Sequence, residues 1–188
     1  MAVDFLLKLG EIKGEGMGPV LGEVADPLSK DRKNGWIEVI SWSWGFAQTG
    51  TRREKTGAGA GKIHVQDMTF NHWVDSASAD ISRACVTGQC FKKAMLACHK
   101  PGAKQRTPYL ILTFEDVIVT DVNIGGSEGQ EHATERVNLN FANFLIEYWI
   151  QEPDGTFTRT NPFGWKIRES EEFRKQTNLG KMGSPPSR

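Results

Sequence analysis

The chain lacks several features that would place it in a common functional class. It has only three cysteines in 188 residues, Cys85, Cys90 and Cys98, and no CxxC pair. We therefore expect reduced thiols rather than a disulfide framework or a cysteine-rich metal site. The 23 Lys and Arg residues balance the 23 Asp and Glu residues. A formal net charge of zero provides no bulk attraction to nucleic acid or to an anionic membrane, and this balance favours a protein partner.

Long apolar runs are also absent. The sequence has no stretch of about 18 apolar residues, and residues 1–10 do not combine a basic segment with a long apolar core. We therefore expect neither a signal peptide nor membrane insertion. Export of such a chain would require a dedicated machine.

Signatures of catalysis and of cofactor binding are missing as well. The four histidines show no metal-ligand spacing with one another or with cysteine: His64, His72, His99 and His132. Cys98 and His99 are adjacent, so in a strand their side chains would point to opposite faces, which disfavours a nucleophile and base pair. Residues 57–62 end in Gly-Lys but lack the spacing and the following helix of a phosphate loop. We expect no cofactor, no metal and no enzymatic activity.

What the sequence does contain is a series of alternating apolar patterns, which predict about eight strands. They cover residues 3–9, 37–46, 62–70, 91–99, 109–122, 134–149 and 163–168. Within 134–149 the phase changes near Ala142 and Asn143, which predicts a bulge or bend. Regularly spaced strands without alternating helices predict a mainly β fold, an antiparallel two-sheet barrel or sandwich with one short flanking α-helix.

That helix is predicted over residues 76–88, where serines and Asp80 are expected to cap the first turn and Gly88 the last. Residues 14–35, with several glycines and a charge cluster, read as a long surface loop. Residues 169–188 have no periodic apolar pattern. We therefore expect one domain over 1–168 and a flexible C-terminal tail over 169–188.

The strand over residues 37–46 has one apolar and one small polar face. Strand alternation places Ile40, Trp42, Trp44 and Phe46 on one side, and Ser41 and Ser43 on the other. Exposed tryptophans can stack on sugars, but a face shared with Ile40 and Phe46 is typical of a core. We expect core anchors at four positions: Trp42, Trp44, Phe46 and Trp165.

Taken together, the segments resemble the Hcp (haemolysin-coregulated protein) family, which forms the inner tube of the bacterial type VI secretion system. The matching segments are MAVDFLLKLG (1–10), KGE (13–15), ISWSWG (40–45), KIHVQDMTF (62–70), Ala84-Cys85 with Gly88, GGS (125–127), Thr134-Glu135, LNFA (139–142) and GWKIR (164–168). The resemblance covers about residues 1–168 in order.

The resemblance implies a β-barrel that assembles into hexameric rings, which stack into a hollow tube and carry small effector proteins. The implied partners are other copies of the chain, the surrounding sheath, the spike protein at the tube tip and the effector cargo. The protein would be cytoplasmic before assembly and then secreted by the type VI machine. Three alternatives stay open: a tail-tube protein like those of contractile phages, a carbohydrate-binding β-sandwich, and a small hydrolase using Cys98 or a histidine.

The resemblance also suggests which residues meet a neighbour. Members of the family extend the loop that corresponds to residues 48–61 between neighbouring subunits, and its glycines would permit close backbone approach. We expect the following interface residues: Gln48, Thr49, Arg52, Arg53, Glu54, Lys55 and Lys62. The alternative is a flexible surface loop; nucleic-acid binding by these basic residues is not expected, because Glu54 interrupts them and no aromatic residues are interleaved. Ser41 and Ser43 are expected to face the lumen, or else an adjacent subunit.

Overall fold

Strands make up most of the chain that the computed structural model describes, which is residues 4–10, 20, 22–25, 34–48, 63–99, 108–152 and 157–173. The elements in order are β1 (Asp4–Leu9), β2 (Val24–Ala25), β3 (Asn34–Ser43), β4 (Phe46–Gln48), β5 (Ile63–Val65), β6 (Met68–Trp73), α1 (Ser78–Thr87), β7 (Cys90–His99), β8 (Pro108–Gly125), β9 (Thr134–Asn140), β10 (Asn143–Gln151), β11 (Phe157–Arg159), β12 (Phe163–Lys166) and β13 (Glu171–Phe173). Within the described residues, no helix is both long and apolar enough to cross a membrane.

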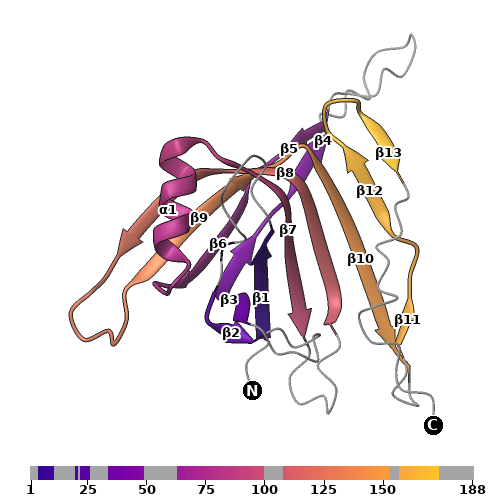
Figure 1. Ribbon diagram of the computed structural model, residues 1–188. Helices are drawn as coiled ribbons and strands as arrows, with labels where there is room; N and C mark the ends of the chain where they lie inside the picture. The colour runs from indigo at the N-terminus through magenta and orange to yellow at the C-terminus, as the bar shows by residue number, and fades with distance from the viewer. Residues whose placement is uncertain are drawn as a thin grey trace.

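Six of the strands close into a barrel. The order is β8-β7-β1-β3-β6-β9, all neighbours are antiparallel, and β9 returns to pair with β8. The length of β8, 18 residues, makes this closure possible, because residues 110–115 pair with β10 while residues 118–125 pair with β9. Strands β10, β12 and β13 continue the sheet beyond the barrel, and α1 lies on the opposite flank (Figure 1). The predicted antiparallel barrel with one flanking helix is thus confirmed.

The interior of the barrel is filled by the inward positions of its strands. Phe70, Phe91 and Phe114 are among the largest fully buried side chains of these strands, and Phe144 of the neighbouring strand β10 is buried in the same core. Burial of a side chain of this size stabilises the fold by roughly 1.5–3 kcal/mol. Aromatic rings meet edge-on or tilted within this core, as aromatic pairs prefer; the Phe114 and Phe141 centroids are 4.4 Å apart.

The helix α1 ends as the sequence predicts but begins differently. Gly88 has φ 65° and ends the helix in the left-handed conformation, which glycine adopts without steric cost. At the other end, the N-cap is Ala77, which has no capping side chain, so the prediction that a serine or Asp80 caps this end is wrong. Instead, the Asp75 carboxylate accepts a hydrogen bond from the Ala77 N–H at 2.9 Å, because the turn before the helix brings Asp75 over its first N–H groups.

Strand phase departs from the prediction in β3. The register against β6 shifts between Val39 and Ser41, so β3 carries a bulge there. Val39 is 4% exposed and Ile40 is 44% exposed. Simple alternation predicted that Ile40 would share the inward face of Trp42. The bulge instead leaves Ile40 on the exposed side, so this prediction is wrong.

Three other expected features can be compared with the structure. The phase change near Ala142 is a break between two strands, since β9 ends at Asn140 and β10 begins at Asn143. The segment expected to be a surface loop, 14–35, includes β2 and the start of β3, and most of its other residues lie outside the described part. Ordered structure continues past residue 168, because β13 pairs with β12; residues 174–188 of the expected tail lie outside the described residues.

Candidate functional site

Trp42 and Trp44, at the end of β3, pack against the core of the barrel. Trp42 is half-buried and meets Phe5 edge-on, with the ring centroids 6.2 Å apart. The Trp44 ring lies 4.7 Å from that of Phe144 and 5.3 Å from that of Phe114. Its indole N–H donates a hydrogen bond to the Gln66 carbonyl oxygen at 3.1 Å. Both tryptophans thus pack against the core with one edge still accessible to solvent.

The other two expected anchors behave differently from each other. Trp165 of β12 is half-buried, packs against the main core and pairs with Phe144 across the sheet. Phe46 is 46% exposed, so the prediction that it is a core anchor is wrong. The strand β3 ends before Gly45, and Phe46 begins β4. Among the described residues β4 pairs with β5 alone, in a two-stranded sheet separate from the barrel sheet. The ring of Phe46 stacks on Phe144 from outside, with centroids 5.7 Å apart.

Small polar side chains cover the outward face of β3, β6, β9 and β8. We call them the polar ladder, and its members are Ser41, Asp67, Thr69, Asn71, Thr120, Asn138 and Asn140. Asn71 donates a hydrogen bond to the Ser41 hydroxyl at 2.9 Å, and Thr69 donates to the Asn138 side-chain oxygen at 2.9 Å. The hydrogen-bonded side chains cross from strand to strand. This pattern gives a wet outer wall of fixed shape on the side of β3 that bears Ser41.

The Asp67 carboxylate extends the polar ladder at its far end. It accepts one hydrogen bond from Thr120 and one from Asn140, each at 2.8 Å. Ser43 is exposed and pairs with Thr69 on the same sheet. The two serines singled out in the sequence therefore belong to a continuous polar surface rather than to a pocket.

Only the first residue of the expected interface loop lies in the described part. Gln48 ends β4 and is exposed. The others lie outside the described residues: Thr49, Arg52, Arg53, Glu54, Lys55 and Lys62. Strands β4 and β5 pair antiparallel, with Gln48 opposite Ile63, so the loop leaves and re-enters the fold at one point.

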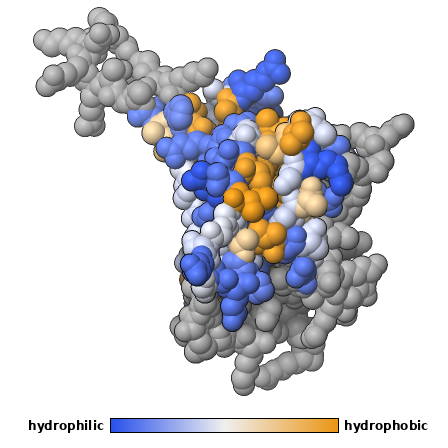
Figure 2. Space-filling view, turned by 90° about the vertical axis from the view of Figure 1, so that its left-hand side faces the viewer, coloured by the Kyte–Doolittle hydropathy of each residue, from blue (hydrophilic) through white to orange (hydrophobic). Residues whose placement is uncertain are grey.

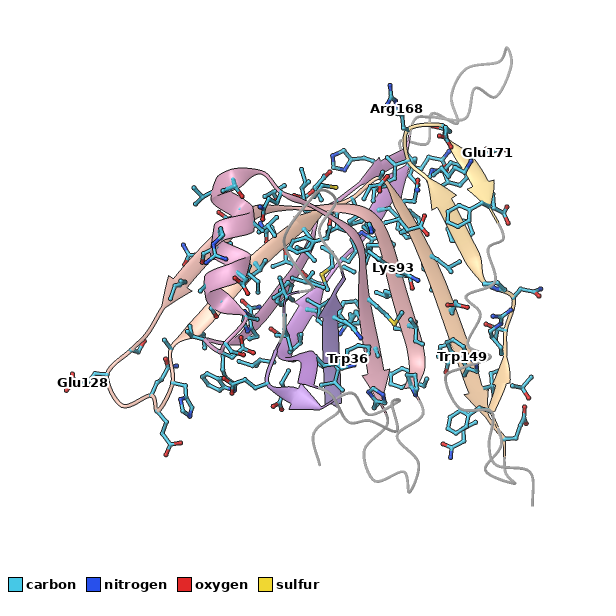
Figure 3. All side chains as sticks on the ribbon, in the orientation of Figure 1. Trp36, Lys93, Glu128, Trp149, Arg168 and Glu171 are labelled. Atoms are coloured by element: carbon cyan, nitrogen blue, oxygen red, sulfur yellow. The ribbon has the colours of Figure 1, made fainter. Side chains whose placement is uncertain are left out.

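Exposed apolar side chains gather on two opposite sides of the molecule. On one side lie α1 and the β8–β9 hairpin, with Val86 88% exposed and with Ile124 and Trp73 also exposed. Figure 2 shows a band of apolar surface across this side. On the other side, Tyr148 and Ile150 of β10 are exposed. Figure 3 shows Glu128 at the hairpin tip and Trp149 on β10 at these opposite ends.

Tyr148 and Ile150 are exposed because β10 is longer than the core beneath it. Phe144 is buried in the core and Ile146 packs against it. Tyr148 and Ile150 continue the same strand phase past the core. Two apolar residues in inward phase are therefore left uncovered on this side.

Cysteine chemistry finds little support in the geometry. Burial raises the pKa of the Cys98 thiol to about 12. A thiol with such a pKa remains protonated near neutral pH and is a poor nucleophile. The Cys85 and Cys90 thiols are half-buried. Within the described part, no three His, Cys, Asp or Glu side chains are arranged to hold a metal ion.

Comparison with known proteins connects this geometry to a family. The family described as "Type VI secretion system effector, Hcp" matches residues 7–148. The chain belongs to the Hcp family. Among curated proteins, Protein hcp1 of Pseudomonas aeruginosa is 37% identical over 173 residues, which cover 90% of this chain and 98% of that protein. The tube-subunit role that the sequence predicted is thereby confirmed.

Solved Hcp structures share the fold. A structure described as a type six secretion system protein superposes with a TM-score of 0.77 at 25% identity, covering 92% of this chain and all of the other. Hcp1 from Salmonella typhimurium has a TM-score of 0.66 at 29% identity, covering 92% of this chain and all of that chain.

Sequence reasoning missed one prominent group of residues. His72 of β6 and Glu135 of β9 are completely buried opposite each other, with Nε2 and Oε2 2.9 Å apart. The signal was available in the strand pattern, because His72 is in phase with Phe70, and Glu135 is in phase with Val137. Inward phase places an ionisable side chain inside the barrel even where its polarity suggests the surface.

Proposed function

We propose that this Hcp subunit forms a closed homohexameric ring, that the rings stack into a hollow tube, and that the tube carries small effector proteins. A ring requires a heterologous interface, in which one surface of a subunit meets a different surface of the next. The observation that carries the proposal is the pair of exposed apolar surfaces, one on α1 and the β8–β9 hairpin and one on β10. Figure 1 shows that these elements lie on opposite sides of the barrel. Apolar side chains gathered in this way are typical of interaction surfaces.

The two surfaces are both apolar, so each could bury the other from water. The α1 and hairpin side offers Val86, Ile124 and Trp73, and the β10 side offers Tyr148 and Ile150. Because the two sets lie on opposite flanks, the α1 and hairpin surface of one subunit can contact the β10 surface of the next. Each subunit then uses both of its apolar surfaces, one toward each neighbour. Repetition around an axis then closes a ring.

In this arrangement we assign the polar ladder, with Ser41 and Ser43, to the lumen. A wall of small hydrogen-bonded side chains exposes little apolar area, so it would let a folded cargo protein pass without strong adhesion. Ser43 lies beside Thr69 on this wall, and Ser41 is held by Asn71. Weak polar contacts suit a tube that must both hold and release its cargo.

We assign the loop that begins at Gln48 and ends at Lys62 to contacts between neighbouring subunits or rings. Its paired ends at β4 and β5 fix where it leaves the barrel. Its glycines and mixed charges would allow close approach and set the register between rings.

The remaining partners follow from the tube role. We propose that the assembled tube meets a spike protein at its tip and a sheath around it, and that the subunit is cytoplasmic before assembly and secreted by the type VI machine. No catalytic step is required of the chain. The protonated, buried Cys98 agrees with this non-enzymatic role.

Light scattering coupled to size exclusion tests the ring. We expect a species with a mass near six times 20.9 kDa, and Ile150→Glu should weaken its assembly at least about tenfold, because it places a charge in the apolar interface. Ile40→Glu is the matched control, since Ile40 is exposed to almost the same extent (44% against 46%) but lies on β3 beside the polar ladder.

Electron microscopy of the same samples provides the second readout. The wild type and Ile40→Glu should both show rings, whereas Ile150→Glu should show few. A wild-type protein that stays monomeric at all concentrations would overturn the ring. Equal loss of rings in both variants would overturn the assignment of the β10 surface.

A further inference from the structure

Asp67 differs from the rest of the polar ladder, because it is a carboxylate whose hydrogen bonds come from neutral groups. Its Oδ2 accepts a hydrogen bond from the Thr120 hydroxyl, and its Oδ1 accepts one from the Asn140 amide, each at 2.8 Å. These donors stand on two neighbouring strands, β8 and β9, so they fix the orientation of the carboxylate on the wall. Neither donor carries a charge. The two bonds therefore orient the negative charge of Asp67 without neutralising it.

No cation compensates this charge within the described residues. The Asp67 side chain is half-buried, and no Lys, Arg or His of the described part forms an ion pair with it. The second carboxylate on this wall is different, because Asp121 lies 4.0 Å from the Arg136 guanidinium. Both of these residues are paired with members of the ladder, Asp121 with Asn138 and Arg136 with Asn71. The ladder and this ion pair together carry two carboxylates and one guanidinium, so negative charge is in excess.

The neutral members of the ladder discriminate little between partners. Hydroxyl and amide side chains both donate and accept hydrogen bonds, so the serines, threonines and asparagines suit almost any polar surface. An ionised carboxylate only accepts, and a hydrogen bond that involves a charged group is roughly twice as strong as one between neutral groups. Asp67 therefore sets the selectivity of the wall, because it favours partners that offer lysine or arginine side chains.

We propose that the polar ladder is a docking surface for the basic side chains of cargo proteins, and that the Asp67 carboxylate is the point at which they bind. This inference rests on the tube proposed above, which assigns the ladder to the lumen, and it adds the chemical class of the cargo. An acidic protein surface meets the like charge of Asp67. The phosphates of nucleic acid are disfavoured for the same reason.

The strength of such contacts suits a cargo that must be released. Asp67 is only half-buried, and a solvent-accessible ion pair strengthens binding about fivefold at most. Repetition of Asp67 around a ring lets several lysine or arginine side chains of one cargo protein bind at the same time. Each contact still breaks easily. Thr120 and Asn140 act as positioning residues, because they hold the carboxylate for its partner.

Fluorescence anisotropy with two labelled peptides, hexalysine and hexaglutamate, tests the docking surface on the full chain in whatever assembly it forms. We expect the wild type to bind hexalysine more tightly than hexaglutamate. Asp67→Asn should weaken hexalysine binding about fivefold. Asparagine has nearly the same shape and its amide oxygen still accepts a hydrogen bond, but the charge is lost. Raising the salt concentration should reduce the difference between the two proteins, because salt screens solvent-accessible charges.

Glu171→Gln is the matched control for net charge. It removes one negative charge from an exposed position on β13, outside the ladder, so hexalysine binding should stay at the wild-type level. Ser43→Asp tests the surface in the opposite direction. Ser43 is exposed beside Thr69 on the same wall, and an added carboxylate there should strengthen hexalysine binding about fivefold. This variant keeps the test open if Asp67→Asn does not fold.

Four results would refute the docking surface: a wild type that binds hexaglutamate as tightly as hexalysine, a folded Asp67→Asn protein with wild-type affinity for hexalysine, equal losses in Asp67→Asn and Glu171→Gln, or a folded Ser43→Asp protein with wild-type affinity. The mass of the same samples separates this inference from the ring. A monomer whose hexalysine binding depends on Asp67 supports the docking surface and refutes the ring. A hexamer whose hexalysine binding does not depend on Asp67 refutes the docking surface alone.

Discussion

Glu147 of β10 is completely buried, and Arg159 of β11 holds it, with Nη1 donating to Oε1 at 3.1 Å. Glu147 lies on the opposite face of β10 from Phe144 and Ile146, which face the main core. Leu145 and Trp149 are buried on the same side as Glu147. Strand β10 thus buries residues on both faces, and the charge of Glu147 is neutralised by Arg159 of the short strand β11 beside it.

Arg159→Ala should destabilise the fold by about 2 kcal/mol, because it removes a charged hydrogen bond from a buried carboxylate. Urea unfolding followed by tryptophan fluorescence measures the change. Glu171→Ala is the matched control: the Lys166–Glu171 pair is about as short, at 3.3 Å, but exposed, so its loss should leave the free energy of unfolding almost unchanged. Equal costs for the two variants would contradict the importance of burial at Glu147.

Trp44→Ala should cost about 3 kcal/mol, since it removes edge-on contacts with Phe114, Phe141 and Phe144 from the barrel core. Phe46→Ala should cost about 1 kcal/mol, because Phe46 is exposed and its ring contacts only the neighbouring rings of Trp44 and Phe144 within the described residues, with centroids 5.5 Å and 5.7 Å away. Denaturant titration of both variants measures the difference. A larger loss for Phe46→Ala would show that β4 supports the barrel more than its exposure indicates.

Much of the fold could be predicted because period-two alternation responds mainly to burial on one face. Alternation alone does not predict where a strand carries an extra residue, that is, a bulge. The register of β3 against β6 shifts between Val39 and Ser41, whereas its register against β1 is regular, so the bulge appears only once the partner strands are known. β13 escaped prediction for a different reason: Glu171 and Glu172 are exposed, and the strand is held by backbone pairing to β12.

The candidate surfaces were harder to predict than the core. Ser41 and Ser43 could be placed on the outward face from alternation alone, but their connection to Asn71 and Thr69 depends on which strand lies beside β3. Tyr148 and Ile150 look like core residues in the sequence, since they continue the phase of Phe144. Only the structure shows where the core ends beneath the strand.

Gly164→Ala should loosen the outer sheet. A Cβ at Gly164 would lie 2.6 Å from the backbone carbonyl oxygen of Phe173, so β12 and β13 would have to separate. We expect a loss of about 1–3 kcal/mol, as for overpacking in general, together with faster proteolysis beyond residue 168. Gly126→Ala is the matched control, because its Cβ would lie 3.8 Å from Ala133 in ordinary contact. Unchanged proteolysis in Gly164→Ala would mean that β13 is not held by this close approach.

Cys98 gives the fold a dependence on alkaline pH. Burial raises the pKa of its thiol from 9.0 to about 12 in the folded state. The thiol ionises at a lower pH in the unfolded chain than in the folded protein. The contribution of Cys98 to the free energy of unfolding is therefore fully present below pH 9 and is lost as the pH rises towards about 12. Urea unfolding at pH 8 and at pH 10.5 should show that the wild type loses more stability at the higher pH than Cys98→Ala does. In a second experiment, Cys98 should react with thiol reagents more slowly than the half-buried Cys85 and Cys90. Fast modification of Cys98 in the folded protein would contradict its burial and would reopen the possibility of a reactive thiol.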